Sequence, residues 1–414
     1  MEQGDCRDSM KIRKRKSPEN EEGLGLPLDE LNQDLLERVL SWLPTSTFFR
    51  LGSVSKRWKS TAASATFRLA CSQIPRREPW FFMVDSHLHH QWTVFDSAEW
   101  NWKNLHHPPL LHQNSCRNFI PVAASGGLIC FRSESGDFVV CNPVTGSSRE
   151  LPKLDRPRQS LQAIAMTSSK RYHSQPSYKL VLVMGEHPNL SFKEYNSSTN
   201  CWGGERILHR KTDSSSAEHD TNSDHTAYFI SKGGDVLVTD IHRSPSKQYS
   251  SVITLEKGNE EVIYFFSSEG TIVACNLTQN FFFEYPRLLP VFYEYSIDLV
   301  ECGGEMFVVV LSDFLESSSL RVWKFNECVQ TWNQIAAMPP AMSHQFHGKK
   351  VDINCTGAGG NQILVCINSG EVCCYVFGDL VANEWIELPS SCMNGKSNDY
   401  MSAFCFEPRI EALV

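Results

Sequence analysis

Residues 133–146, SESGDFVVCNPVTG, are similar in sequence to residues 267–280, SSEGTIVACNLTQN, in the second half of the chain. In each stretch a polar turn precedes a short apolar run that ends at an asparagine, Asn142 or Asn276. An Asp or Asn recurs six residues before an aromatic residue at other places in the chain. These pairs are Asp96 and Trp102, Asn196 and Trp202, Asn276 and Phe282, Asn326 and Trp332, and Asp379 and Trp385, with Asn142 and Ser148 and, more weakly, Asp240 and Ser246 in the same frame. The sequence therefore predicts a structural repeat.

The spacing of this repeat predicts a β-propeller. The residues that stand six positions after each of these Asp or Asn residues, from Trp102 to Trp385, follow one another at intervals of 36 to 54 residues. The runs between them are rich in Val, Ile, Phe and Tyr and are separated by Gly, Asn, Ser and Pro, which is typical of short strands. Units of this length with four short strands are propeller blades. Seven such positions favour seven blades, and the short step from Ser246 to Phe282 leaves six blades as the alternative.

Each unit carries residues suited to its turns and its outer strand. An Asp or Asn tolerates the tight turn after the third strand, and a tryptophan gives the fourth strand a large apolar body to pack between blades. Glycine pairs at 126–127, 303–304 and 359–360 allow positive φ in turns between first and second strands. The first unit shows only three strands, so we expect the C-terminal strand 401–406 to complete it.

Residues 28–69 have a helical spacing of apolar residues, unlike the rest of the chain. Leucines and Val39 recur at steps of three and four before Pro44, which ends the first helix. A second helix is expected from Phe48 to Val54, and a third carries Trp58. Three such short helices cannot bury all of these side chains, so the surplus indicates either a partner surface or packing on the larger domain.

This helical module resembles an F-box. The family pattern has a paired-leucine helix, a Leu-Pro and a V-x-K-x-W close. The matching residues are Leu31, Leu35, Leu36, Val39, Leu40, Leu43, Pro44, Val54, Lys56 and Trp58. The sequence departs from the pattern in two places. The family's first Leu-Pro appears as Leu31-Asn32 or is shifted to Leu26-Pro27, and Ser55 stands where a cysteine is common. The resemblance implies that the matching residues dock on the Skp adaptor of a cullin-RING ubiquitin ligase.

The repeat, with its paired glycines and delayed tryptophan, resembles a kelch-type propeller. Together with the F-box, the chain is similar to plant F-box/kelch-repeat proteins of the group that includes the floral regulator Unusual Floral Organs. The likeness extends through DRPR at 155–158 and MPPAMSHQF at 338–346. The fold class expected is multi-domain, α plus all-β: a disordered tail at 1–26, a three-helix F-box module at 27–75 and a kelch-type β-propeller at 76–414.

The longest connections between the predicted strands lie on one face of the propeller. They are residues 151–160, 209–226, 286–294, 312–319, 338–348 and 389–400. Binding residues concentrate in long loops on a rigid scaffold. We therefore expect the target protein to contact Arg156 and Arg158, which can bind carboxylates, the aromatic anchors Phe292 and Tyr293, and His344 and Phe346. Ordinary surface loops are the alternative.

Residues 1–26 are charged and have almost no large apolar residues, so we expect them to be disordered. Lys11, Arg13, Lys14, Arg15 and Lys16 form a basic cluster of the kind that nuclear-import receptors bind, or a solvated tail. A nuclear location is expected, with the cytoplasm as the alternative. The chain has 39 basic and 47 acidic residues, and without the cluster 34 and 47. This acidic balance excludes a broad basic field for nucleic acid.

The remaining composition argues against a membrane partner and against chemistry. Neither a signal peptide nor an apolar run of membrane-spanning length occurs. Fifteen cysteines without a CxxC pair indicate reduced, mostly buried thiols. No catalytic motif or metal-ligand spacing occurs, so we expect no catalytic residue, no metal and no cofactor.

The expected function is that of a non-enzymatic substrate-recognition subunit of a Skp/cullin/F-box ubiquitin ligase. The F-box would hold the adaptor and the propeller loops an unidentified target, raising the target's effective concentration near the ubiquitin-charged enzyme. The alternative is a non-degradative nuclear cofactor that binds a transcription factor through its propeller.

Overall fold

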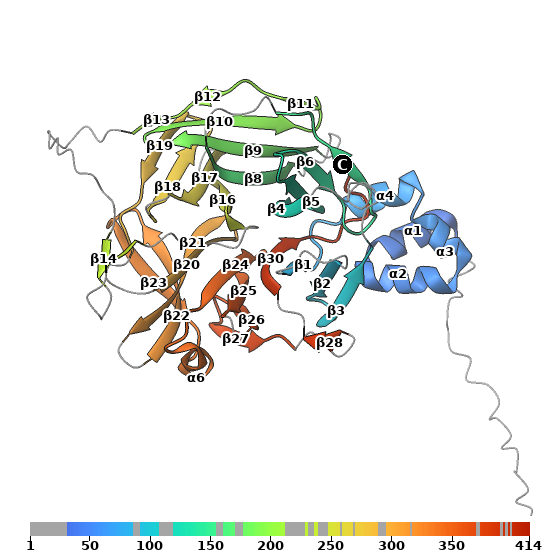
Figure 1. The fold of residues 1–414 in the computed structure, drawn as a ribbon. Coiled ribbons are helices and arrows are strands. Elements are labelled where there is room, and N and C mark those ends of the chain that lie inside the picture. Colours follow the sequence, from blue (N-terminus) through green and yellow to red (C-terminus); the bar gives the residue numbers. More distant parts are fainter. Residues whose placement is uncertain are drawn as a thin grey trace, which may run out of the picture.

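A group of helices lies next to a ring of β-sheets in the computed structural model (Figure 1). The structure describes residues 31–85, 92–106, 119–154, 160–169, 177–211, 228–230, 236–238, 247–256, 259–267, 270–288, 295–314, 317–369, 373–389, 392–393, 396–397 and 400–414. The predicted tail and its basic cluster lie outside these residues. None of the described helices is long and apolar enough to cross a membrane.

Four helices form the N-terminal module, one more than predicted. They are α1 (Gln33–Ser41), α2 (Thr45–Val54), α3 (Lys56–Thr61) and α4 (Ala65–Ser72). The Asn32 side chain caps α1 by accepting the N–H of Asp34 at 2.8 Å. Ser64 caps the additional helix α4 by accepting the N–H of Phe67 at 3.4 Å. The Ser64 cap was the local signal for α4 that the sequence analysis missed.

The described residues form a propeller of six blades, so the favoured expectation of seven is wrong and the alternative of six is confirmed. Each blade is an antiparallel sheet whose innermost strand faces the centre of the ring. From inside to outside, blade one consists of β30 (Tyr400–Phe406), β1 (Trp80–Asp85), β2 (Trp92–Asp96) and β3 (Asn101–Leu105), and blade two of β4 (Phe119–Ser125), β5 (Leu128–Ser133), β6 (Phe138–Cys141) and β7 (Ser148–Glu150). Blade three consists of β8 (Leu161–Ser169), β9 (Ser177–Glu186), β10 (Asn189–Asn196) and β11 (Cys201–Trp202), and blade four of β16 (Ser251–Glu256), β17 (Glu260–Phe266), β18 (Ile272–Asn276) and β19 (Phe281–Glu284). Blade five consists of β20 (Tyr295–Cys302), β21 (Glu305–Phe314), β22 (Ser317–Asn326) and β23 (Thr331–Ala337), and blade six of β24 (Asp352–Gly357), β25 (Gln362–Asn368), β26 (Cys373–Asp379) and β27 (Glu384–Glu387). The expected closure is confirmed, because β30 pairs with β1 from Trp80 opposite Phe406 onward.

The predicted unit that ended at Ser246 does not form a blade of its own. Among the described residues between blades three and four, β12 (Arg206–Ile207) pairs with β10, and β13 (His209–Arg210) adds to β19 in parallel. The hairpin of β14 (Tyr228–Ile230) and β15 (Val236–Val238) makes a separate two-stranded sheet. Asp240 and Ser246 lie outside the described residues; the described part of this segment adds short strands to blades three and four and forms one separate hairpin. A second small sheet, β28 (Cys392–Met393) with β29 (Lys396–Ser397), precedes β30.

Apolar side chains fill every interface between neighbouring blades. Successive residues of a strand point to opposite sides of the sheet, so Phe81 packs against blade six while Phe82 packs against blade two. Because both faces are covered, middle strands such as β1, β2 and β6 are buried along nearly their whole length rather than alternating. Eight of the twelve free cysteines among the described residues are buried in the structure, and burial raises the pKa of thiols such as Cys374 to about 12.

The Asp or Asn of the repeat makes the same turn in all six blades. Its side-chain Oδ1 accepts backbone N–H groups two and, in five blades, also three residues later, at 2.8 to 3.4 Å. The residue four positions on has a φ between 50° and 72° in every blade. Gly146 fills this place in blade two without steric cost. The turn before the fourth strand is thus fixed by local chemistry, as the sequence predicts.

Three of the four repeat tryptophans join their outer strand to the preceding blade by a hydrogen bond, whereas Trp385 Nε1 donates to Asn383 Oδ1 of its own turn at 3.2 Å. Trp102 Nε1 donates to the Pro389 carbonyl at 2.9 Å, and Trp202 donates to that of Pro152 at 2.8 Å. Trp332 donates to the Pro286 carbonyl at 2.8 Å. Each of these three proline acceptors follows the outer strand of the neighbouring blade, so apolar packing and a hydrogen bond act together at these seams.

Two faces of the ring follow from this topology. The turn face carries the connections from first to second and from third to fourth strands, including the glycine turns at Gly126, Gly303 and Gly359, whose φ values are positive. The loop face carries the opposite connections, including α6 (Pro340–Ser343) and the 3-10 helix η3 (His344–Phe346).

Candidate functional site

The inner side of the helical module is a small hydrophobic core. Leu36, Leu40, Phe48 and Phe67 are buried, and the rings of Phe48 and Phe67 stack at 4.9 Å between centroids. Ile410, from the C-terminal segment that follows the last propeller strand, completes this core. The apolar inner side of the helices is therefore covered partly by the segment that follows the propeller's last strand.

The outer side of α1 carries an apolar stripe that the described residues leave uncovered. Leu35, Val39 and Trp42 follow one another at steps of four and three, which places them on one side of a helix. Their side chains are 54%, 47% and 67% exposed. Phe49 and Leu69 on other helices of the module are also exposed. Large apolar side chains exposed along one side of a helix are typical of a surface that binds a partner.

The structure divides the ten predicted adaptor-binding residues into two groups. Exposed or partly exposed members are Leu31, Leu35, Val39, Leu43, Pro44, Val54, Lys56 and Trp58. Leu36 and Leu40 are 0% and 3% exposed, so they form the core and cannot touch a partner in this conformation. In the pairs Leu35-Leu36 and Val39-Leu40 of α1, the first residue faces outward and the second inward. The prediction missed Trp42, Phe49 and Leu69, although Trp42 could have been found at the helical step after Val39.

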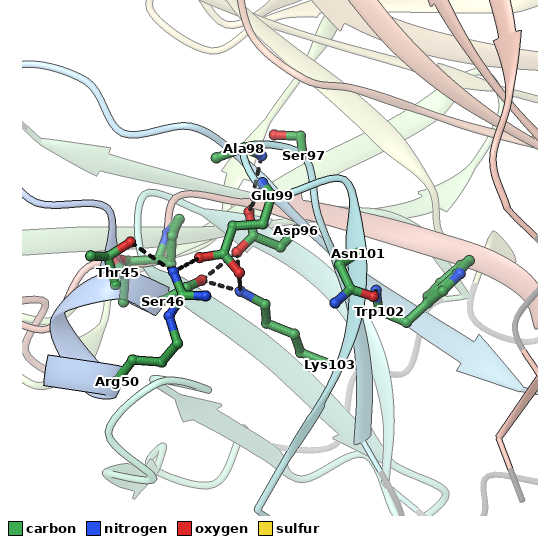
Figure 2. Close-up of polar contacts among 12 residues, drawn as sticks. Thr45, Ser46, Arg50, Asp96, Ser97, Ala98, Glu99, Asn101, Trp102 and Lys103 are labelled. Atoms are coloured by element: carbon green, nitrogen blue, oxygen red, sulfur yellow. Dashed lines mark hydrogen bonds and ion pairs between the residues drawn. The ribbon is translucent and has the colours of Figure 1, made fainter. Parts of the chain in front are cut away.

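Two hydroxyl groups at the start of α2 hold the module against the first blade (Figure 2). Thr45 Oγ1 donates to the carbonyl of Pro408 at 2.6 Å. Ser46 is hydrogen bonded to Oδ2 of Asp96, the repeat residue of blade one. Both hydroxyl residues are buried, so these contacts are shielded from water.

A chain of charges completes this junction. Lys103 Nζ lies 2.5 Å from Asp96 Oδ2 and 2.7 Å from Glu99 Oε2, and Arg50 of α2 lies 2.8 Å from Glu99 Oε1. Burial of Asp96 opposes its ionisation, but the hydrogen bonds from Lys103, Ser46 and the Glu99 N–H outweigh that cost. The pKa of Asp96 is therefore lower than its ordinary value, and the carboxylate is charged.

Two arginines tie the linker and the C-terminal segment into the same junction. Arg77 donates to the carbonyls of Ser41 and Leu43 at 2.9 and 3.0 Å, across the gap between α1 and α2. Arg409 donates to the Ile74 carbonyl at 3.2 Å and to Glu411 at 2.9 Å. Both arginines are mostly buried. The helices are thus packed onto the turn face of the propeller at blades one and two, and the loop face stays uncovered by them.

The candidate target-binding residues are only partly described. Arg156, Arg158, Phe292 and Tyr293 lie outside the described residues. His344 is exposed on the loop face and stacks on His347 with ring centroids 6.0 Å apart. Phe346 is 1% exposed and packs in the core between blades five and six, which removes it from the surface candidates.

Comparisons with known proteins agree with this architecture. The F-box domain family matches residues 28–69, and the KIB1-4 beta-propeller family matches residues 94–376. The chain belongs to the F-box proteins with a KIB1-4 β-propeller. The kelch type of the propeller is not confirmed by this match.

Three relatives from Arabidopsis thaliana are similar to this chain over most of its length. F-box only protein 13 is 53% identical, over 97% of this chain and 90% of its own length. F-box only protein 6 is 25% identical over 87% of this chain and 69% of its own length. Protein UNUSUAL FLORAL ORGANS is 22% identical over 92% and 84%. The resemblance to the plant F-box proteins around UNUSUAL FLORAL ORGANS is therefore confirmed.

Proposed function

We propose that this F-box protein is the substrate-recognition subunit of a Skp/cullin/F-box ubiquitin ligase. F-box proteins generally act as substrate receptors of such ligases, and an F-box implies binding to a Skp adaptor. The observation that carries the proposal is the uncovered stripe of Leu35, Val39 and Trp42 on a helical module whose other side is fully packed.

The position of the helices supports the loop face as the place where the target binds. The junction covers part of the turn face at blades one and two, whereas the long connections emerge on the other face. The exposed His344 lies there, on a short helical segment supported by the buried Phe346. In this arrangement the chain brings a target to the ubiquitin-charged enzyme and supplies no catalytic group.

Adaptor binding is tested by titrating the full-length protein with a purified Skp adaptor. The triple variant Leu35→Ala, Val39→Ala and Trp42→Ala removes the stripe without touching the core of the module. Loss of one central aromatic anchor costs about 2 kcal/mol or more, so the dissociation constant should rise at least ~30-fold.

A matched control removes exposed apolar side chains from the propeller. Val381 and Ile386 of blade six are 76% and 53% exposed, and the double variant to alanine should bind the adaptor like the wild type. Equal adaptor affinity of the stripe variant and this control would refute the proposed adaptor surface. Absence of adaptor binding by the wild type would refute the ligase role and leave the non-degradative cofactor.

We also propose that the protein enters the nucleus and that its propeller is of the kelch type. The cluster from Lys11 to Lys16 supports nuclear import, and changing its five basic residues to glutamine should move a fluorescent fusion to the cytoplasm. An unchanged distribution of the fusion would contradict import through this cluster. Glycine pairs in three first turns and the tryptophans of four outer strands support the kelch type.

A further inference from the structure

The six inner strands surround a cavity of about 1280 Å³ at the centre of the propeller. Its lining includes Gly126, Gly304 and Gly359 in the turns between first and second strands, so the cavity reaches the turn face. Arg76, in the linker between the helices and β1, also lines it. Pockets that hold small ligands usually enclose several hundred cubic ångströms, so the space suffices for a small molecule and water.

The segment from Lys247 to Ser250, just before β16, crosses the ring and narrows this cavity. Lys247 Nζ donates to the Cys355 carbonyl of blade six at 2.7 Å and lies 5.4 Å from the ring centre of Phe404 in blade one. The Tyr249 carbonyl accepts the N–H of Ile164 in blade three at 3.0 Å. A segment that precedes blade four therefore contacts three other blades and places an ammonium group in the channel.

Not all N–H groups of the Lys247 ammonium have an acceptor among the described residues. Its side chain is 7% exposed and carries three N–H groups. The described residues accept one hydrogen bond from it, at Cys355, and the carboxylate of Asp298 is 3.9 Å away. That carboxylate oxygen accepts the Cys355 N–H at 2.6 Å. Because a buried charge is costly unless its donors are satisfied, this group favours an acceptor within the cavity.

Two further polar groups of the lining lack partners among the described residues. Thr254 Oγ1 is buried in the wall of the cavity without a hydrogen bond. Arg76 is exposed at the turn-face rim and makes no ion pair or hydrogen bond with a described residue. The guanidinium of Arg76 lies over Gly359, where an added Cβ would come within 3.1 Å of it. The glycine turn thus leaves room for a cation at the rim.

Two acidic groups of the lining are paired with cations other than Lys247 and Arg76. Glu261 is paired with Lys179 at 3.2 Å, and Glu407 is paired with Arg409. Burial raises the pKa of Glu301, which disfavours its charged form. Among the described residues, Lys247 therefore has the Asp298 carboxylate, 3.9 Å away, as its ion-pair partner, and Arg76 has none.

We propose that the central cavity is a binding site for a small organic anion, whose carboxylate or phosphate group is held by Lys247 and attracted by Arg76 at the rim. This proposal is independent of the ligase role. The site is reached from the turn face, beside the linker that carries Arg76 and Arg77, and it is separate from both the apolar stripe and the loop face.

The test is calorimetric titration of the full-length protein at low ionic strength with citrate, with inorganic phosphate and with uncharged glycerol. Saturable binding of citrate or of phosphate, without binding of glycerol, supports the site and shows which group it prefers. Arg76→Gln should weaken that binding about tenfold, because a charge-assisted contact is lost. The matched control is Arg68→Gln on α4, which is exposed, does not line the cavity and should leave binding unchanged.

A second variant separates binding from folding. Lys247→Met should abolish binding, and circular dichroism shows whether that variant keeps the propeller intact. If Lys247→Met unfolds, the comparison of Arg76→Gln with Arg68→Gln decides alone, because both positions are exposed. The proposal would be overturned if neither citrate nor phosphate binds. It would also be overturned if the wild type and Arg76→Gln bind the anion with equal affinity.

Discussion

Replacing Asp96 with asparagine isolates the negative charge that holds the helices on the first blade. Asparagine stands at the same repeat position in four other blades, where its Oδ1 accepts the N–H groups of the turn. Asp96→Asn therefore keeps the turn of blade one. It removes the carboxylate that lies 2.5 Å from Lys103 Nζ and is hydrogen bonded to Ser46.

The expected cost follows from the surroundings of the pair. Removing one partner of a fully buried ion pair costs about 3 to 5 kcal/mol. Asp96 is 1% exposed, but Lys103 is 21% exposed and keeps Glu99 at 2.7 Å. We therefore expect a loss of about 2 kcal/mol for Asp96→Asn. Asp96→Ala also loses two turn hydrogen bonds of about 1 kcal/mol each, so its loss should be about 4 kcal/mol.

Native-state hydrogen exchange measures this cost where it arises, because it reports the free energy of local opening. Peptides that cover α2 and residues 96–103 should exchange faster in Asp96→Asn, by the factor that corresponds to about 2 kcal/mol. The control is Asp379→Asn in blade six, where the turn is the same and no junction is attached. Unchanged exchange in Asp96→Asn, or an equal loss in Asp379→Asn, would refute the role assigned to the Asp96 charge.

Three further changes test other parts of the structure. The pKa of Asp96 is lower in the folded protein than its ordinary value of 3.8, so the ionised carboxylate stabilises the fold fully above pH 3.8 and loses this effect as the pH falls through the lowered pKa. Acid unfolding of Asp96→Asn should therefore lack the loss of stability that protonation of Asp96 causes in the wild type. Identical acid unfolding curves of the two proteins would contradict this expectation. Trp332→Phe loses the hydrogen bond to the Pro286 carbonyl and should cost about 1 kcal/mol in urea unfolding, whereas Trp100→Phe, whose indole makes no hydrogen bond with a described residue, should cost less. Ile410→Ala opens a cavity in the helical core and should lower the stability of α1 and α4 by about 2 to 4 kcal/mol in hydrogen exchange, while exchange in blade four stays unchanged.

The repeat could be predicted from sequence because its chemistry is local. Asn276, for example, makes its turn with residues two and three positions on, so the fixed spacing to Phe282 is visible in one dimension. The helical module could be predicted for a similar reason, since caps and apolar steps lie close together in the chain. The closure by β30 was also inferable, because the first unit was one strand short.

The blade number could not be read in this way, because it depends on pairing between distant residues. His209 and Arg210 pair in parallel with Phe281 and Phe282, and nothing in the local sequence specifies that partner. A weak match at Ser246 therefore counted as a seventh blade, whereas the described residues build six. The burial of Phe346 is a similar case, because it depends on how η3 folds back onto blade five.

The exposure of each leucine in α1 likewise depends on a segment at the opposite end of the chain. Ile410 packs on the side of α1 that carries Leu36 and Leu40, which leaves Leu35 and Val39 on the outside. The helical period alone allows either side to face the propeller. Only the tertiary contact with the C-terminal segment assigns the outer stripe.

The second side-chain atom of the repeat residue explains why the helices sit on blades one and two. In every blade Oδ1 is used by the turn, which leaves the other polar atom of the Asp or Asn available. In blade one this atom is Asp96 Oδ2, which binds Ser46 and Lys103. In blade two it is Asn142 Nδ2, which donates to the carbonyls of Arg409 and Ala412 at 2.8 and 3.0 Å. A residue required for the blade turn thus also anchors the helices and the C-terminal segment, and changing only its second atom should loosen the junction while the propeller stays folded.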